Sequence, residues 1–165
     1  MKQRVYSLLM DNTPGVLSRI AGLFSRRGYN IDSITAGVTT DPAFTRMTIV
    51  CSGDDIVLEQ IRKQLAKLVD VRDIRELPPE DSVTHELMMA KLAASERDRQ
   101  NILAIAEIFK AKTVDVGPES MTLEVVGTVS KLSAFLNLLK GYEILELART
   151  GVAGISRGVD NMKSF

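Results

Sequence analysis

The strongest constraint on the fold is an order of strand and helix patterns that occurs twice along the chain. A strand-type apolar run at residues 5–10 comes first. A helix pattern opens at Thr13-Pro14, with apolar residues at i, i+3, i+4 and i+7: Leu17, Ile20, Ala21 and Phe24. Two alternating β-branched runs then meet near Asp41-Pro42 and predict a hairpin. A second helix from about Asp54 and a closing strand at 69–77 complete the order βαββαβ.

The remainder of the chain repeats this order. The segment from Arg46 aligns without a gap with the segment from Ser120, so that Gly53 faces Gly127. Pro78-Pro79 marks a boundary, because neither proline can donate a hydrogen bond to a sheet. We therefore expect an α+β fold of two ferredoxin-like domains in tandem, each an antiparallel four-stranded sheet with two helices on one face. The expected limits are a first domain at 1–77, a linker at 78–83 and a second domain with a tail at 84–165.

Composition excludes several classes of function. Lys and Arg together number 21, as do Asp and Glu, and this balance argues against a general binder of nucleic acid or anionic membranes. The chain has one cysteine, Cys51, so an intrachain disulfide cannot form. No apolar run approaches the length of a membrane span, and the apolar stretch near the N-terminus is too short for a signal peptide. The expected location is the cytoplasm.

The turn "DNTPGVL" at 11–17 separates the first strand from the first helix and is the best candidate for a site. Free N–H groups and a partial positive charge make a helix N-terminus an anion site. Gly15 lets a ligand approach the backbone closely, and the free donors would be the amides of Gly15, Val16 and Leu17. Asn12 adds a side chain that can accept from an ammonium or donate to a carboxylate, so the combination suits an α-amino acid.

The alternative is an ordinary helix start, with Thr13 as the N-cap and Pro14 as the first helical residue. The matching segment of the second half, "LAASERDRQNI", has no Pro-Gly pair and no asparagine at the turn. A requirement of folding alone should have been met similarly in both halves. The asymmetry therefore favours a site in the N-terminal half only.

The segment "DNTPGVLSRIAGLFSRRGYNIDSIT" resembles the opening of the ACT domain, a small-molecule-binding regulatory module of amino-acid metabolism. Together with "DPAFTRMTIV", "LEQIRKQLAKLVDV" and the closing "ARTGVAGISRG", the chain resembles the small regulatory subunit of acetolactate synthase over essentially its whole length. The pairing of "GLFSRRGYNI" with "RTGVAGISRG" is the specific part of this resemblance.

The resemblance implies a chain without catalytic activity that activates a large catalytic subunit and confers feedback inhibition by a branched-chain amino acid, usually valine. It implies no cofactor in this chain and thiamine diphosphate, Mg and FAD on the large subunit. It also implies a homodimer of ACT domains with the effector at the dimer interface. The implied effector-binding residues are Asn12, Gly15, Val16 and Leu17 of one chain, Asn30 and Ile31 of the other, and Thr35. No metal-binding or catalytic residue is implied.

Two other functions remain open from the residues. A stand-alone ACT-type amino-acid sensor would bind the ligand but ignore a synthase large subunit. An enzyme on a ferredoxin-like scaffold, such as an acylphosphatase-like hydrolase, would need a phosphate site built from Arg19 or Arg26 with Asn30. RNA-recognition domains share this fold but stack bases on aromatic residues of their strands, and the candidate strands here offer only Tyr6. The sequence therefore gives little support to RNA binding.

The remaining chemistry-bearing residues favour structural roles. Cys51 sits in the middle of a predicted strand, so buried packing is expected. His85 is the sole histidine and lacks the neighbours of a metal site. The glycine-rich tail carries Arg149 and Arg157, and the family resemblance makes it a candidate contact with the large subunit.

Overall fold

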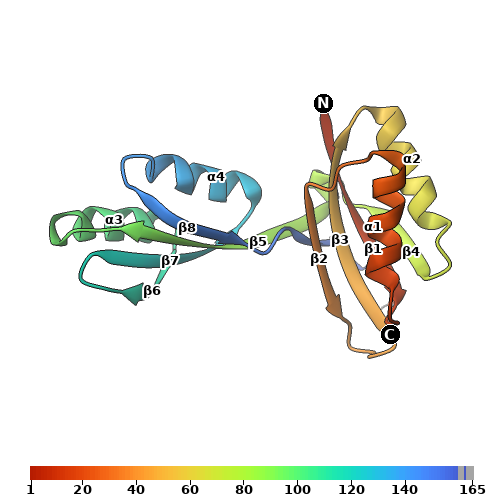
Figure 1. Cartoon of the computed structure of the whole chain (residues 1–165), viewed down its shortest axis with the longest axis horizontal. Coiled ribbons are helices and arrows are strands. Elements are labelled where there is room, and N and C mark those ends of the chain that lie inside the picture. The colour runs from red at the N-terminus through yellow and green to blue at the C-terminus, as the bar shows by residue number, and fades with distance from the viewer. Residues whose placement is uncertain (160–161, 163–165) are drawn as a thin grey trace. The chain divides into compact units, whose positions relative to one another are not determined.

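The computed structural model describes residues 1–159 and 162. The chain forms two compact units (Figure 1). The first unit contains residues 1–84 together with the chain from Val152, and the second unit contains residues 85–151. The chain therefore leaves the first unit, builds the second and returns.

The first unit has the order βαββαβ, with two helices on one face of an antiparallel sheet (Figure 1). Its strands lie in the order β2-β3-β1-β4, so β2 is an edge strand. Tyr6 pairs with Ile49 and Leu8 with Met47, and these side chains face the helices in the core. The elements are β1 (Lys2–Asp11), α1 (Val16–Arg27), β2 (Ser33–Val38), β3 (Phe44–Gly53), α2 (Asp55–Ala66) and β4 (Val71–Glu76).

The second unit repeats this arrangement, with the strand order β6-β7-β5-β8. Its core joins both helices to alternate residues of β5 and β7; Met88 of β5, Leu123 of β7 and Phe135 of α4 are among its members. A short 3-10 helix, η1 (Pro79–Asp81), precedes it. The elements are β5 (Ser82–Ala93), α3 (Glu96–Ile108), β6 (Lys112–Val116), β7 (Ser120–Gly127), α4 (Val129–Leu138) and β8 (Ile144–Arg149).

The predicted fold and its internal repeat are confirmed. Gly53 and Gly127 each end a strand, and the next residue in each case caps the following helix. The Asp54 side chain accepts from the backbone of Val57, and the Thr128 side chain accepts from the backbone of Lys131. Over the described residues, no helix combines the length and apolarity needed to cross a bilayer.

The tail differs from the prediction, because it belongs to the first unit. Its strand β9 (Ala153–Ser156) pairs with β5 and packs near β1 and β3. The Gly154 N–H donates to Oγ1 of Thr48 over 3.2 Å, and the Arg157 N–H donates to the Asp81 carbonyl over 2.7 Å. The tail packs there because it removes apolar side chains from water. The sheet face opposite α1 and α2, here called the outer face, carries Leu9 and Val50, and both are buried. The boundary also differs from the predicted linker, since it falls inside β5.

Candidate functional site

The turn between β1 and α1 has an unusual helix start. The N-cap is Gly15, with φ 86°, so neither Thr13 nor Pro14 takes the helical positions expected for an ordinary start. No side chain caps α1, and its first turn contains no acidic residue. The amides of the first turn, Val16 to Ser18, are therefore left for another acceptor.

The other three α-helices of the described chain begin conventionally. Asp54, Ser95 and Thr128 are N-caps in extended conformation, and each side chain accepts from a backbone N–H of its helix. α1 alone combines a left-handed glycine with an uncapped end. A helix end of this kind, with its partial positive charge, is suited to an anion.

A hollow of about 260 Å³ lies at this turn. Asn12, Gly15, Val16 and Leu17 all line it, so the structure brings four of the predicted effector-binding residues together. Val16 buries its side chain in the core, whereas the Leu17 side chain is 56% exposed and offers apolar surface. The other lining residues are Met10, Asp11, Thr13, Pro14, Ala36 and Thr45.

The β2–β3 hairpin holds Asn12 in place. Its Nδ2 donates to the Pro42 carbonyl over 2.8 Å, and its Oδ1 accepts from Oγ1 of Thr45 over 3.2 Å. Its backbone N–H donates to the Ala43 carbonyl. A side-chain amide has two hydrogens and two acceptor sites, so one of each remains for a ligand.

Two arginine–carboxylate pairs flank the turn. Arg72 donates to both oxygens of Asp11 over 2.6 and 2.8 Å, and Arg19 donates to both oxygens of Asp70 over 2.5 and 3.0 Å. Donation to these carboxylates raises the pKa of both guanidinium groups. Because each carboxylate is paired with an arginine, the local charge is close to neutral, and the uncapped helix end is the distinctive electrostatic feature.

Asn30 and Ile31 lie away from the turn within one chain. They precede β2, whose first residue pairs with Val50, while its last residue pairs with Thr45 beside the hollow. At about 3.3 Å per residue, the two ends of β2 are roughly 17 Å apart. Asn30 is exposed and its Nδ2 donates to Asp32, and Ile31 packs against the core. The structure therefore does not bring this pair to the turn of the same chain.

Thr35 lies on the opposite side of β2 from the hollow. Its Oγ1 donates to the Val152 carbonyl over 3.0 Å, and the neighbouring Ser33 accepts from the Val152 N–H over 2.9 Å. Ala36, the next residue along β2, lines the hollow instead, as expected from alternation in a strand. Thr35 anchors the tail in this chain and does not join the residues at the turn.

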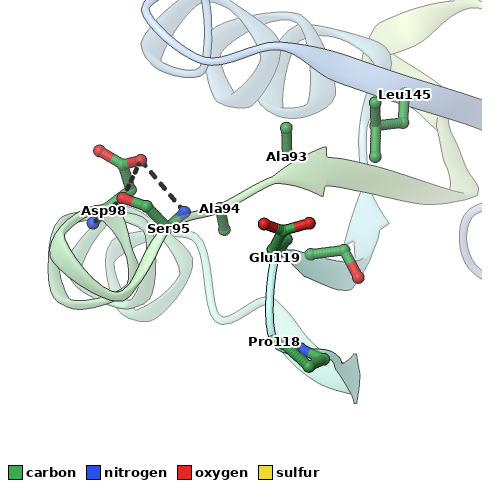
Figure 2. Close-up of a pocket in the computed structure, with 8 residues that line it drawn as sticks. Ala93, Ala94, Ser95, Asp98, Pro118, Glu119 and Leu145 are labelled. Atoms are coloured by element: carbon green, nitrogen blue, oxygen red, sulfur yellow. Dashed lines mark hydrogen bonds between the residues drawn. The ribbon is translucent and has the colours of Figure 1, made fainter.

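The corresponding turn of the second unit is closed. Figure 2 shows the Asp98 carboxylate accepting from both the backbone N–H and the hydroxyl of Ser95, and the Asp98 N–H in turn donates to that hydroxyl. This capping box satisfies the helix end from within. A hollow of about 780 Å³ lies here, but Asp98 and Glu119 line it, which disfavours an anion. Its larger volume does not make it the better candidate.

Of the other candidate residues, Cys51 is buried, and Arg19 and Arg149 are already paired with carboxylates. Cys51 is fully buried, and burial raises the pKa of its thiol to about 12, so the prediction of a packing role is confirmed. His85 is exposed, and the described residues contain no group of three metal-type ligands. Arg19, one half of the alternative phosphate site, is already paired with Asp70. Arg149 makes two bonds of 2.8 Å to the buried Glu86.

The sequence did not reveal that Ala36 and Thr45 complete the hollow, or that Asp70, just before β4, and Arg72, within β4, support the turn. These residues come from elements distant in sequence from the turn. The register of the predicted hairpin could have placed Thr45 near the end of β2. The pairing of Asp70 with Arg19 and of Asp11 with Arg72 cannot be predicted from the positions of these residues in the sequence.

Comparisons with known proteins identify both units. Residues 6–73 match the family model of the AHAS small subunit-like ACT domain, and residues 85–158 match that of the small subunit of acetolactate synthase. A probable acetolactate synthase small subunit of Methanothermobacter thermautotrophicus is 50% identical over 96% of this chain and 95% of its own length. The isozyme 3 small subunit of Escherichia coli is 47% identical over 94% of this chain and 96% of its own.

A solved structure agrees with these matches. The crystal structure of the acetolactate synthase small subunit from Thermotoga maritima superposes with a TM-score of 0.87 at 39% identity, covering 97% of this chain and all of that one. The first unit is thus an ACT domain of the small-subunit type. The chain belongs to the family of acetolactate synthase small subunits, which are regulatory subunits in branched-chain amino-acid synthesis. The resemblance read from the sequence is confirmed.

Proposed function

We propose that this chain activates the large catalytic subunit of acetolactate synthase in the cytoplasm and makes it subject to feedback inhibition by valine. Thiamine diphosphate, Mg and FAD would all reside on the large subunit, and this chain would hold no cofactor. The observation that carries the effector site is the uncapped start of α1 at Gly15, beside Asn12 and a hollow, whereas the corresponding helix start of the second unit is closed by a capping box.

The ligand chemistry follows from the groups at the turn. An α-carboxylate would accept from the first-turn amides, where charge-assisted hydrogen bonds contribute about 1.5–3 kcal/mol each. The free acceptor site of Asn12 would take the α-ammonium. The exposed Leu17 and Ala36 offer apolar surface to an aliphatic side chain. Valine fits a hollow of about 260 Å³, and the selection against leucine or isoleucine would rest on one methylene group.

The effector site would be completed by a second copy of the chain. β2 is an edge strand, so two copies could pair along it in antiparallel fashion. Such pairing would set the start of β2 in one copy beside the end of β2 in the other. Asn30 and Ile31 would then approach the hollow of the neighbouring chain, which a single chain cannot achieve.

Inhibition follows from linkage. Valine can lower the activity of the complex only if it binds the low-activity arrangement more tightly than the active one. A ligand that bridges two copies at β2 is suited to such a bias, because its affinity depends on how the two edge strands meet.

A thermal-shift titration of the full chain against the twenty amino acids tests the binding half of this proposal. A ligand that binds only the native state, at a concentration one hundred times its dissociation constant, adds about 2.7 kcal/mol to the free energy of unfolding. This corresponds to a rise of roughly 5–10 °C in Tm. We expect a shift with valine. No shift with any amino acid, together with a catalytic subunit that valine does not inhibit when this chain is added, would refute the effector site.

The large-subunit assay separates the alternatives. Activation of the catalytic subunit on addition of this chain is the expected result. Valine binding without any effect on the catalytic subunit would instead identify a stand-alone ACT-type sensor.

A further inference from the structure

Two carboxylates of its own chain, Asp11 and Asp70, lie close to the proposed effector site, and the site must accept a third carboxylate from the ligand. We infer that Arg19 is a positioning residue of the effector site, acting through Asp70 to hold and neutralise this acid beside the turn. This inference rests on the proposed amino-acid site and goes beyond it, because Arg19 does not line the hollow.

Both acids are attached directly to the turn. Asp11 lines the hollow, and its backbone N–H donates to the Asp70 carbonyl over 2.9 Å. The Asp70 side chain is 11% exposed, so water screens its charge poorly. Arg72 neutralises Asp11 and Arg19 neutralises Asp70, each through two hydrogen bonds.

Arg19 is also in contact with the turn. Its backbone N–H donates to the Gly15 carbonyl over 3.0 Å in the first turn of α1. Its Nη1 lies 3.1 Å from the point that a Cβ on Gly15 would occupy. Nε and Nη2 face Asp70, so the guanidinium packs between the acid and the N-cap of α1.

The second unit shows that the fold does not require this pair. Arg99 follows the N-cap Ser95 by four residues, as Arg19 follows Gly15. It donates through Nη2 to the carbonyls of Gly117 and Pro118, over 2.8 and 2.7 Å, and not to a carboxylate. An arginine at this position therefore serves a closed turn without neutralising an acid, and the pairing with Asp70 is specific to the open turn.

The electrostatic consequence is direct. Without Arg19, the poorly screened Asp70 would repel a ligand carboxylate at the same helix end. Without Asp70, Arg19 would remain as a cation near the ligand. The two single changes should thus act in opposite directions, which a purely mechanical brace between α1 and the turn before β4 would not produce.

Calorimetric titration of the full chain with L-valine at pH 8 tests this. Arg19→Met should weaken binding about tenfold. Asp70→Asn should bind valine at least as tightly as the unchanged chain. The double variant Arg19→Met, Asp70→Asn should have a valine affinity within about threefold of that of the unchanged chain. Arg26→Met is the matched control, because it removes the same charge from the last turn of α1 and should leave affinity unchanged.

Several results would overturn the inference. An affinity of Arg19→Met equal to that of Arg26→Met excludes a role for Arg19. Equal losses in Arg19→Met, Asp70→Asn and the double variant identify a brace without the electrostatic role. If Arg19→Met does not fold, a tenfold loss in the folded double variant decides against the inference. Absence of binding by the unchanged chain overturns the effector site as well.

Discussion

The turn that opens α1 and the turn that opens α3 occupy the same place in two copies of one fold, yet they are built differently. At α3, Ser95 and Asp98 satisfy the helix end from within. At α1, a left-handed Gly15 leaves the end uncapped and Asn12 is held beside it by the hairpin. The comparison teaches that a helix start can serve either stability or ligand binding, since the same N–H groups cannot do both at once.

The largest expected effect comes from closing the open turn with a charge. Gly15→Asp should abolish valine binding, with a loss of at least about 100-fold, because two charge-assisted hydrogen bonds are worth about 3–6 kcal/mol. The added carboxylate would compete with that of the ligand, and a φ of 86° strains any side chain. Calorimetric titration with valine measures the loss.

Gly141→Asp is the control for this change, because nothing lies within 4 Å of a Cβ at Gly141. It adds the same charge to the second unit and should leave affinity unchanged. Valine binding retained in Gly15→Asp would remove the basis for distinguishing the two turns.

The outer faces of the two sheets differ as well. In the first unit, Leu9 and Val50 are 2% and 4% exposed beneath the returning tail. In the second unit, Met89 and Val126 on the corresponding face are 41% and 45% exposed. Gly154→Val should sharpen this contrast: its Cβ alone would meet Leu77 at 2.8 Å and Thr84 at 2.9 Å.

We expect Gly154→Val to destabilise the first unit by about 1–3 kcal/mol, the usual cost of overpacking. Urea unfolding measures the difference. Ile155→Thr is the control, since Ile155 is exposed in the same strand and its change should stay within about 0.5 kcal/mol. Equal stability of Gly154→Val and the control would show that β9 does not pack closely on the first unit.

Alkaline pH should distinguish the two units. Burial raises the pKa of Tyr6 and of Cys51 to about 12, above their ordinary values, and both residues lie in the first unit. A group whose pKa is higher in the folded state than in the unfolded state contributes its full stabilisation of the fold below the unfolded-state pKa. This contribution declines as the pH rises from the unfolded-state pKa towards the folded-state pKa. The free energy of unfolding of the first unit should therefore fall from about pH 9 upwards, by on the order of 1–2 kcal/mol at pH 10.

Hydrogen exchange resolved by peptide, at pH values corrected for intrinsic rates, would follow each unit separately. The double variant Tyr6→Phe, Cys51→Ala should lose the pH dependence in the first unit. If the free energy of unfolding of the first unit declined equally with pH in that variant, groups other than Tyr6 and Cys51 would be responsible for the pH dependence.

The smallest expected effect comes from opening the closed turn. Ser95→Ala removes the N-cap of α3 and should destabilise the second unit by about 1 kcal/mol. Valine affinity should not change, because the hollow at α1 contains no residue of this unit. Urea unfolding and calorimetry measure the two quantities. A change in affinity would mean that the two turns are coupled.

Periodicity predicted most of the fold because each half has strongly patterned strands and helices around its own core. The turn was found from Asn12 and Gly15, although the helix begins after Gly15 and not at Pro14, since the left-handed glycine delays its start. The return of the tail was missed, because β9 has only four residues and its partners are far away in sequence. The pair of Arg19 and Asp70 was missed because it depends on tertiary geometry.

The return of the chain at Val152 has a consequence for biosynthesis. Domains generally fold in order as they leave the ribosome, but the outer face of the first sheet receives its cover only when β9 has been made. Throughout translation of the second unit, Leu9 and Val50 would be open to solvent and to chaperones. Strand β9 thus completes a unit whose other strands are made before the second unit.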